Sequence, residues 1–265
     1  MSRVLGRYDA AAIHDLFADA GVLAALTRKG FDHLEVRLED RGGSLPHIVL
    51  SGCKRGEPFL LLDACLGEAV VRPEFFARRG YPMERPVELA VIRWVREQDP
   101  TAQFRPDRPR LPLQRHPGLG VLRHAFRIVV RMAADLGKDG VASVPKFFHD
   151  AVIFHRSRLF LFLDGAEQGR FEALARDLRS LSLGDASLAL VSRCVHEVQR
   201  GVIEWFPGYQ VFPISPPLTG YFHSDEYAAR VTEALQAHRF VCSLEELSRT
   251  REQLAERHGG YGSGA

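Results

Sequence analysis

The sequence predicts an α/β (α+β) protein with a mixed, mainly antiparallel sheet flanked by helices and a mixed C-terminal extension. Runs that alternate apolar and charged residues come early, a long helical period follows a glycine-containing loop, and mainly helical patterns fill about the last hundred residues. We expect three segments, namely an N-terminal helix in residues 1–30, a core in 31–165 and an extension in 166–265.

Composition narrows the class of protein. Of the 265 residues, 46% are hydrophobic and 26% charged, as is typical of an ordinary globular chain. A net charge of +2 is too small for a protein whose main partner is a nucleic acid, so none is expected. No apolar run reaches the length of a membrane span, and the four widely spaced cysteines form no disulfide framework. These features favour a cytoplasmic protein without a membrane partner.

Strand patterns dominate the first third of the chain. A helical pattern over 9–27, capped by Asp9 and loosened near Gly21, comes first. The apolar and polar alternation then predicts three antiparallel strands and, after a short helix or loop, a fourth strand, at 33–39, 46–51, 58–65 and 87–95. The proline-rich stretch 97–113 is a surface excursion or a lid.

Two glycines mark the centre of the chain. Gly118 and Gly120 stand where a helical period over 120–136 begins. Glycines let backbone N–H groups approach an anion, and a helix N-terminus carries partial positive charge, so this pattern suits a phosphate. The dinucleotide motif G-x-G-x-x-G fails because Arg123 holds the third glycine position, and no Gly-Lys-Ser/Thr of a P-loop follows.

The run Arg115-His-Pro-Gly-Leu-Gly120 resembles the coenzyme A loop of the GCN5-related N-acetyltransferase (GNAT) family, whose signature is Arg or Gln, two residues, Gly, any residue, then Gly or Ala. Pro112, the following helix and the order of strand, helix and strand over 140–144, 148–155 and 159–163 agree with the same register. The resemblance implies that an acyl-CoA such as acetyl-CoA binds here, with a strand amide near Leu111 to Leu113 meeting the oxyanion. The implied coenzyme-binding residues are Leu111, Leu113, Arg115, His116, Gly118, Leu119 and Gly120.

Candidate catalytic residues follow from the same register. The family's second helix usually reads Asn-x-x-Ala-x-x-Leu-Tyr, and here Phe148 replaces the Asn and His155 replaces the Tyr that protonates the departing thiolate. An imidazole can donate a proton near neutral pH, so His155 is the candidate acid. A base for the amine must lie on a strand, where Glu88 qualifies by position, as do Asp63 and Glu97.

These residues predict an acyl-CoA-dependent N-acyltransferase, in which a small-molecule or peptide amine attacks the thioester directly. A non-catalytic protein of the same fold, used for coenzyme sensing or protein–protein interaction, is the alternative that Phe148, His155 and Pro117 favour; Pro117 lacks an N–H. In a third interpretation the chain is an unrelated α/β interaction protein, and Gly118 and Gly120 only permit a tight connection between a strand and a helix.

The rest of the chain carries fewer signals. His149 and His155 are six residues apart, which does not match the histidine spacing of a helical zinc site, so no metal is expected. His116 and His124 flank the loop and could contact phosphate. Beyond the core we expect helices at 166–181, 185–196, 224–238 and 243–257, and a hairpin of 202–206 with 209–212. Substrate binding, pairing into a homodimer and completion of the core all stay open for 166–265.

Overall fold

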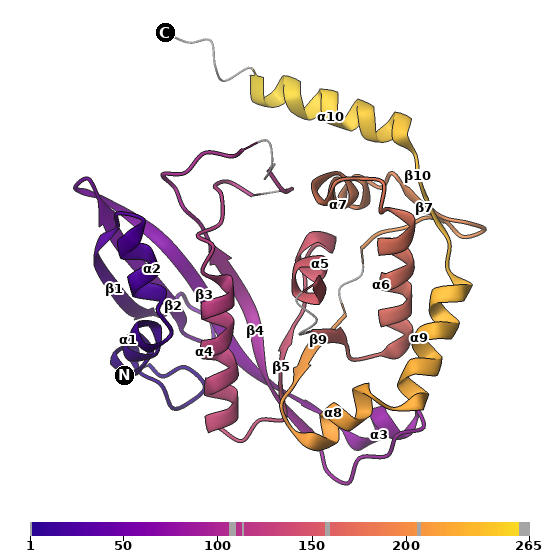
Figure 1. The fold of residues 1–265 in the computed structure, drawn as a ribbon, viewed down its shortest axis with the longest axis horizontal. Helices are drawn as coiled ribbons and strands as arrows, with labels where there is room; N and C mark the ends of the chain where they lie inside the picture. The colour runs from indigo at the N-terminus through magenta and orange to yellow at the C-terminus, as the bar shows by residue number, and fades with distance from the viewer. Residues whose placement is uncertain (1, 106–109, 113, 157–159, 206–207, 260–265) are drawn as a thin grey trace. The chain divides into compact units, whose positions relative to one another are not determined.

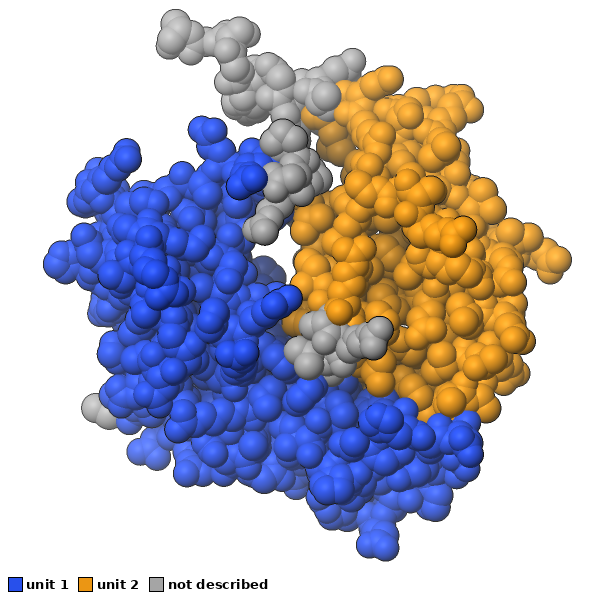
Figure 2. Space-filling view, in the orientation of Figure 1, with its two compact units in different colours: residues 1–110, 114–144, 211–226 blue, residues 111–113, 145–210, 227–265 orange. Residues whose placement is uncertain are grey.

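The computed structural model describes residues 2–105, 110–112, 114–156, 160–205 and 208–259 (Figure 1). They fall into two compact units, which Figure 2 colours separately. Unit 1 contains residues 1–110, 114–144 and 211–226, and unit 2 contains 111–113, 145–210 and 227–265. The division at residues 30 and 165 stays a prediction.

Unit 1 is built on a mixed sheet. Its strands are β1 (Asp32–Glu39), β2 (His47–Lys54), β3 (Glu57–Val71), β4 (Val87–Glu97), β5 (Gly140–Ser143) and β9 (Gln210–Pro213). In this unit they follow the order β1-β2-β3-β4-β5-β9. The first four strands form an antiparallel meander, and β5 runs parallel to β4. This confirms the predicted fold class of a mixed, mainly antiparallel sheet with flanking helices.

Helices cover one face of this meander. The helices of unit 1 are α1 (Ala10–Asp19), α2 (Val22–Arg28), α3 (Pro73–Ala77), α4 (Leu122–Asp135) and α8 (Pro216–Phe222). The Asp9 carboxylate caps α1 by accepting from the Ala12 N–H at 2.9 Å, and Gly21, with φ of +77°, separates α1 from α2. Both helices contact β1, α4 contacts β4 and β5, and α1 contacts α4 (Figure 1). Helices α1, α2 and α4 therefore lie on the same face of the sheet.

The strand register assigns side chains to the two faces of β3 and β4. Leu62 pairs with Glu97, and the next residue, Asp63, pairs with Arg96. Because neighbouring residues of a strand point to opposite faces, Glu97 and Asp63 point in opposite directions. Glu97 lies on the face that carries α4, as its contacts below show, and Asp63 lies on the other.

Unit 2 packs helices around an aromatic core. Its elements are α5 (Phe148–Arg156), β6 (Leu161–Phe162), α6 (Gly165–Asp177), α7 (Leu183–Val191), β7 (Val195–Glu197), β8 (Gly201–Val202), most of α9 (Asp225–Ala237), β10 (Phe240–Cys242) and α10 (Leu244–Gly259). Phe148, Phe162 and Phe171 are buried together in its core. Strands β7, β8 and β10 form a separate sheet of order β10-β7-β8.

Beyond residue 165 two predictions were wrong in detail and one helix was missed. The helix predicted for 185–196 spans Leu183–Val191. Ser182 caps its start by accepting from the Asp185 N–H, and Val195–Glu197 is a strand. Described parts of the predicted hairpin do not pair, since β8 joins β7 and β9 joins the sheet of unit 1. Pro216 begins an unpredicted helix, α8, which Ser215 caps.

In the part of the chain that the structure describes, no single helix has both the length and the apolar character needed to cross a membrane, although α1 and α2 pass such a test as a pair bent by 67°.

Candidate functional site

The glycine loop is fixed at the surface by its apolar neighbours. Leu119 and Val121 are buried, while Gly118 and Gly120 are exposed. Gly120 has φ of +73°, a conformation that costs little only for glycine. The Asp99 N–H donates to the Pro117 carbonyl at 2.7 Å, which ties the loop to the chain just beyond β4. The start of α4 is thus held with its glycine backbone facing outward.

A carboxylate of the chain already occupies the N-terminus of α4. The backbone N–H groups of Gly120 and Val121 both donate to Glu97, the last residue of β4. A Cβ added to Gly118 would lie 3.4 Å from the Glu97 Oε1, so the absent side chain leaves room for this carboxylate. These two N–H groups belong to the loop that the sequence analysis assigned to a diphosphate, and in the structure they bind Glu97.

The charge of Glu97 is set by its burial. Burial raises the pKa of Glu97 from 4.5 to about 7, although the two backbone N–H groups and the charge of Lys29 act to lower this pKa. Its Oε2 is buried and has no hydrogen-bond partner among the described residues. Near neutral pH the Glu97 carboxyl is therefore present in both protonation states. It neutralises the partial positive charge at the start of α4 only in part.

A second polar atom without a partner lies in the first turn of α4. The Nδ1 of His124 is buried and makes no hydrogen bond to any residue in the described ranges. His116 is half-buried and Arg115 exposed in the preceding loop. At this end of α4, Glu97 contacts the N–H groups of Gly120 and Val121, and His124 lies in the first turn. Each of these two side chains has one buried polar atom without a partner among the described residues.

Strands β4 and β5 pair over a short distance only. The parallel pairing joins Leu89–Ile92 to Gly140–Ser143, while β4 continues to Glu97 with β3 as its partner. Arg93 is an extra residue in the β3–β4 register, because Ile92 pairs with Leu66 and Trp94 with Cys65. Such a bulge bends a strand and re-aims its neighbouring groups. From Arg93 to Glu97, the edge of β4 that faces β5 is therefore not part of the parallel pairing. This edge leads along β4 to Glu97 and the start of α4.

The structure does not bring Glu88 to this site. Glu88 stands at the start of β4, nine residues before Glu97, which corresponds to roughly 30 Å along a strand. Its half-exposed carboxylate pairs with the Lys138 Nζ at 2.9 Å, beyond the opposite end of α4. Of the three strand carboxylates considered, Glu97 is the one at the loop, so the role of Glu88 as a base stays a prediction that its position does not favour.

The remaining predicted residues belong to unit 2 or are not described. His155 lies in the last turn of α5, with its Nδ1 3.4 Å from the Phe160 carbonyl and its ring edge-on to Phe171. Leu111 is grouped with unit 2, and Leu113 lies outside the described residues. The proposed oxyanion contact near Leu111 is not on a strand.

One cluster in unit 2 has the residue types of a hydrolytic triad. The His149 Nδ1 lies 2.7 Å from the Ser187 Oγ, and its Nε2 lies 3.4 Å from the Asp150 carboxylate. Ser187 is fully buried, so no substrate carbonyl can approach its hydroxyl. Burial lowers the pKa of His149 and keeps the imidazole neutral. The cluster satisfies polar groups between α5 and α7, and it offers no nucleophile.

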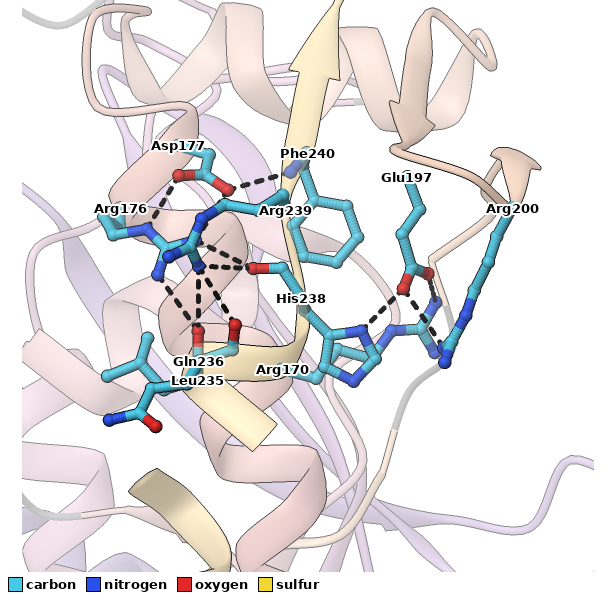
Figure 3. Close-up of polar contacts among 10 residues, drawn as sticks. All are labelled: Arg170, Arg176, Asp177, Glu197, Arg200, Leu235, Gln236, His238, Arg239 and Phe240. Atoms are coloured by element: carbon cyan, nitrogen blue, oxygen red, sulfur yellow. Dashed lines mark hydrogen bonds and ion pairs between the residues drawn. The ribbon is translucent and has the colours of Figure 1, made fainter. Parts of the chain in front are cut away.

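Two further features of unit 2 are structural. The buried Glu197 carboxylate lies 2.7 Å from His238, 3.1 Å from Arg200 and 3.7 Å from Arg170, so its charge is matched. Figure 3 shows these side chains turned toward it. A cavity of about 70 Å³ is lined by Phe162, Glu167, Arg170, Phe171, Leu174, Glu204 and Trp205. That volume holds about two water molecules and no coenzyme. The described residues contain no group of three or more His, Cys, Asp or Glu placed to hold a metal ion.

Comparisons with known proteins identify no family for this chain. No protein-family model and no curated protein matches it. Among solved structures, a mutant of KacT has 11% identity and a TM-score of 0.33 over 68% of this chain and 74% of its own. AtaT complexed with acetyl-methionyl-tRNAfMet has 11% identity and a TM-score of 0.32 over 76% and 81%. An AtaT mutant bound to acetyl-CoA and the C-terminus of the antitoxin AtaR has 15% identity and a TM-score of 0.29 over 63% and 82%.

Proposed function

We propose that this chain is an acyl-CoA-dependent N-acyltransferase with the GNAT-type arrangement that its loop sequence resembles. One observation carries the proposal. The N–H groups of Gly120 and Val121 converge on a single carboxylate at the start of a fourteen-residue helix, α4, beside glycines that keep the approach open. A diphosphate offers the same donors more acceptor oxygens and more charge than one carboxylate does.

In the proposed complex the coenzyme diphosphate takes the two N–H groups, and Glu97 gives them up. The half-protonated state of Glu97 near pH 7 makes this exchange cheaper than the displacement of a fixed anion. The acyl thioester would follow the edge of β4 beyond Ile92, where the pairing with β5 ends. The acceptor amine then attacks the thioester carbon, the C–N bond forms, the C–S bond breaks and the sulfur leaves with the electron pair. His155 remains the proposed acid that protonates this thiolate.

A non-catalytic coenzyme sensor is the second candidate, and the occupancy of the α4 amides by Glu97 favours it. A protein that holds its own carboxylate in this position can report coenzyme binding by releasing it. The two functions share the binding site and differ in turnover. They are therefore separated by whether any amine is acylated once coenzyme is bound.

Coenzyme binding is tested by calorimetry with acetyl-CoA and with CoA on the full chain and on two glycine variants. Gly120→Ala and Gly137→Ala both place an alanine at positive φ, at the two ends of α4, with no atom within 4 Å of the new Cβ. Their stability costs should therefore be similar, about 1 to 2 kcal/mol. Only Gly120→Ala should weaken coenzyme binding, by about tenfold or more. Equal affinities for both variants, or no binding by the wild type, would refute the assignment of the site.

Turnover is tested with an amine panel under saturating acetyl-CoA. The panel contains spermine, leucinamide, a lysine-containing peptide and methionyl-tRNA, the last because the expected absence of a nucleic-acid partner needs a direct test. Acetylation of any member supports the acyltransferase. Coenzyme binding without acetylation of any member supports the sensor instead. In an active enzyme, His155→Phe should lower turnover and leave coenzyme affinity nearly unchanged.

A further inference from the structure

The face of the meander opposite α4 carries an aspartate–histidine pair that the proposed coenzyme site does not use. The His47 Nδ1, on β2, lies 2.7 Å from the Asp63 Oδ1, on β3. Asp63 is 2% exposed, whereas the His47 side chain is 23% exposed. A buried carboxylate on one side of an imidazole and solvent on the other is the arrangement that orients a histidine as a base.

The partners of Asp63 fix which nitrogen of His47 is free. The other Asp63 oxygen accepts from Arg41 at 2.9 Å and lies 3.8 Å from Arg96. Burial alone would raise the pKa of Asp63, but the hydrogen bond from His47 and the nearby Arg41 hold this pKa below its usual value. Asp63 is therefore ionised and accepts the proton on Nδ1 of His47. The Nε2 is then the ring nitrogen that remains for an acceptor, and it has no hydrogen-bond partner among the described residues.

The strand register places this imidazole in the same row as Trp94, which lies two residues beyond the end of the β4–β5 pairing. His47 pairs with Cys65, and Cys65 pairs with Trp94, so the three side chains form one row across β2, β3 and β4 on the same face. Trp94 is 42% exposed and directly follows the bulge at Arg93. Two strand spacings, roughly 10 Å, separate the His47 and Trp94 backbones, a distance that their side chains and a bound amine can span.

We propose that His47, oriented by Asp63, is the general base that deprotonates the acceptor amine, and that the acceptor binds on the β1–β4 face opposite α4. This inference rests on the proposed acyltransferase function. The thioester carbon is trigonal, so the amine attacks it from above or below the plane of the acyl group. The diphosphate occupies the α4 face in the proposed complex, which leaves the face that carries His47 for the acceptor. The exposed Trp94 ring in the same row can hold an organic ammonium by a cation–π contact.

The protons balance in two steps. The His47 Nε2 takes one proton from the ammonium form of the acceptor and later releases it to water. The nitrogen lone pair then forms the bond to the thioester carbon while the C–S bond breaks. The second nitrogen proton balances the one that the proposed acid, His155, gives to the coenzyme sulfur. The charged or titratable groups that face His47 are Asp63, Arg41, Arg96, Glu39 and Cys65. Burial raises the pKa of the Cys65 thiol, which stays protonated and does not compete as a base.

The experiment compares His47→Gln with a control variant, His14→Gln, in an exposed histidine–aspartate pair. His14 lies 3.4 Å from Asp15 on the surface of α1, so His14→Gln removes a histidine–aspartate contact away from the proposed site. The assay measures kcat and KM for the best acceptor of the amine panel, from about pH 6 to about pH 9, together with the Kd of CoA. His47→Gln should lower kcat by about 100-fold or more near pH 7. The loss should shrink toward about pH 9, where more of the amine arrives deprotonated.

The controls separate this proposal from the coenzyme site and from folding. The Kd of CoA should be the same for wild type, His47→Gln and His14→Gln, and added imidazole should restore part of the activity of His47→Ala. Loss of CoA binding in the wild type would refute the proposed function itself. Normal CoA binding without acetylation of any amine by the wild type would refute the acyltransferase on which this inference rests. An active wild type, with a kcat that is unchanged in His47→Gln or lowered equally at every pH, would overturn the assignment of His47 alone.

Discussion

Two carboxylates of unit 1, the half-buried Glu97 and the buried Asp63, stand on neighbouring strands and face opposite sides of one sheet. The pKa of Glu97 is raised to about 7, while the pKa of Asp63 is lowered, although burial acts to raise both. The difference lies in their partners. Glu97 is bound by two backbone N–H groups and keeps one oxygen without a partner in the described chain, whereas Asp63 meets an arginine and a histidine at 2.9 and 2.7 Å.

The comparison shows that burial alone does not decide the charge of a carboxyl in this fold. Cationic side chains keep Asp63 ionised and permanently engaged, which suits a group that orients a neighbour. Amide dipoles without a matching cation leave Glu97 between its two protonation states, which suits a group that yields to a stronger anion. Each prediction below changes one side of this comparison.

The largest effect is expected when Asp63 is removed. In Asp63→Ala the Arg41 and His47 side chains lose their common acceptor, and we expect a loss of about 3 to 5 kcal/mol in the free energy of unfolding at pH 7, as for other broken buried pairs. Urea denaturation measures it. Because the pKa of Asp63 is lowered in the folded chain, its contribution is present above its ordinary value of 3.8 and is lost as pH falls below it.

An Asp63→Asn variant sharpens this test. Asparagine keeps the shape and one acceptor but no charge, so its stability should approach that of the wild type as the pH falls below about 3.8. A difference between the two proteins that persists unchanged at acidic pH would mean that shape, and not charge, is what Asp63 contributes.

The opposite pH dependence is expected for Glu97. A carboxyl whose pKa rises from 4.5 in the unfolded chain to about 7 in the folded one binds more protons when folded, so it favours folding most at low pH. The stability of the wild type relative to Glu97→Gln should therefore fall by roughly 3 kcal/mol between about pH 4.5 and about pH 7. Denaturation curves of both proteins across this range measure the slope. A flat difference would show that Glu97 is ionised throughout.

The sequence predicted the framework of this comparison but not its chemistry. Alternating residues located β1 to β4, and the helical period with Gly118 and Gly120 located α4, because these signals are local. Glu97 was considered as a base only, since its contact with Gly120 joins residues far apart in the chain and leaves no local pattern. The pair of His47 with Asp63 was missed for the same reason, as it depends on the register between β2 and β3.

Errors beyond residue 165 have a different physical cause. Val195 continues the apolar pattern of the helix predicted for 185–196, but β7 is held by pairing with β8 and β10, which leaves no local pattern in the sequence. Phe148 stands where the family resemblance expects an asparagine, and its burial with Phe171 gives it a packing role in unit 2. Propensity yields here to tertiary contacts.

A smaller effect is expected for Arg41→Ala. Arg41 is 39% exposed and also pairs with Glu39, so its removal leaves Asp63 with His47 and the more distant Arg96. We expect a loss of about 1 kcal/mol in unfolding free energy, since hydrogen bonds to charged groups at an exposed rim contribute little more. Arg37→Ala, which removes an exposed arginine of β1 that lies near Glu35 and Glu39, is the matched control and should cost less. Equal losses would mean that Arg41 does not support Asp63.

The smallest effect is expected for Lys29, the one side-chain charge that lowers the pKa of Glu97. Lys29 is 41% exposed and its Nζ lies 4.0 Å from Asp99, so Lys29→Ala should change the unfolding free energy by less than about 0.5 kcal/mol. The pKa of Glu97 should nevertheless move upward, because burial then acts against fewer favourable contacts. Lys54→Ala is the control, since Lys54 binds the Thr101 hydroxyl and does not act on Glu97. If only Lys29→Ala moves the midpoint of the Glu97-dependent pH curve, then the charge of Lys29 helps to set the pKa of Glu97. That result is expected for a carboxyl that forms no direct ion pair. If neither variant moves it, the two backbone N–H groups alone set its charge.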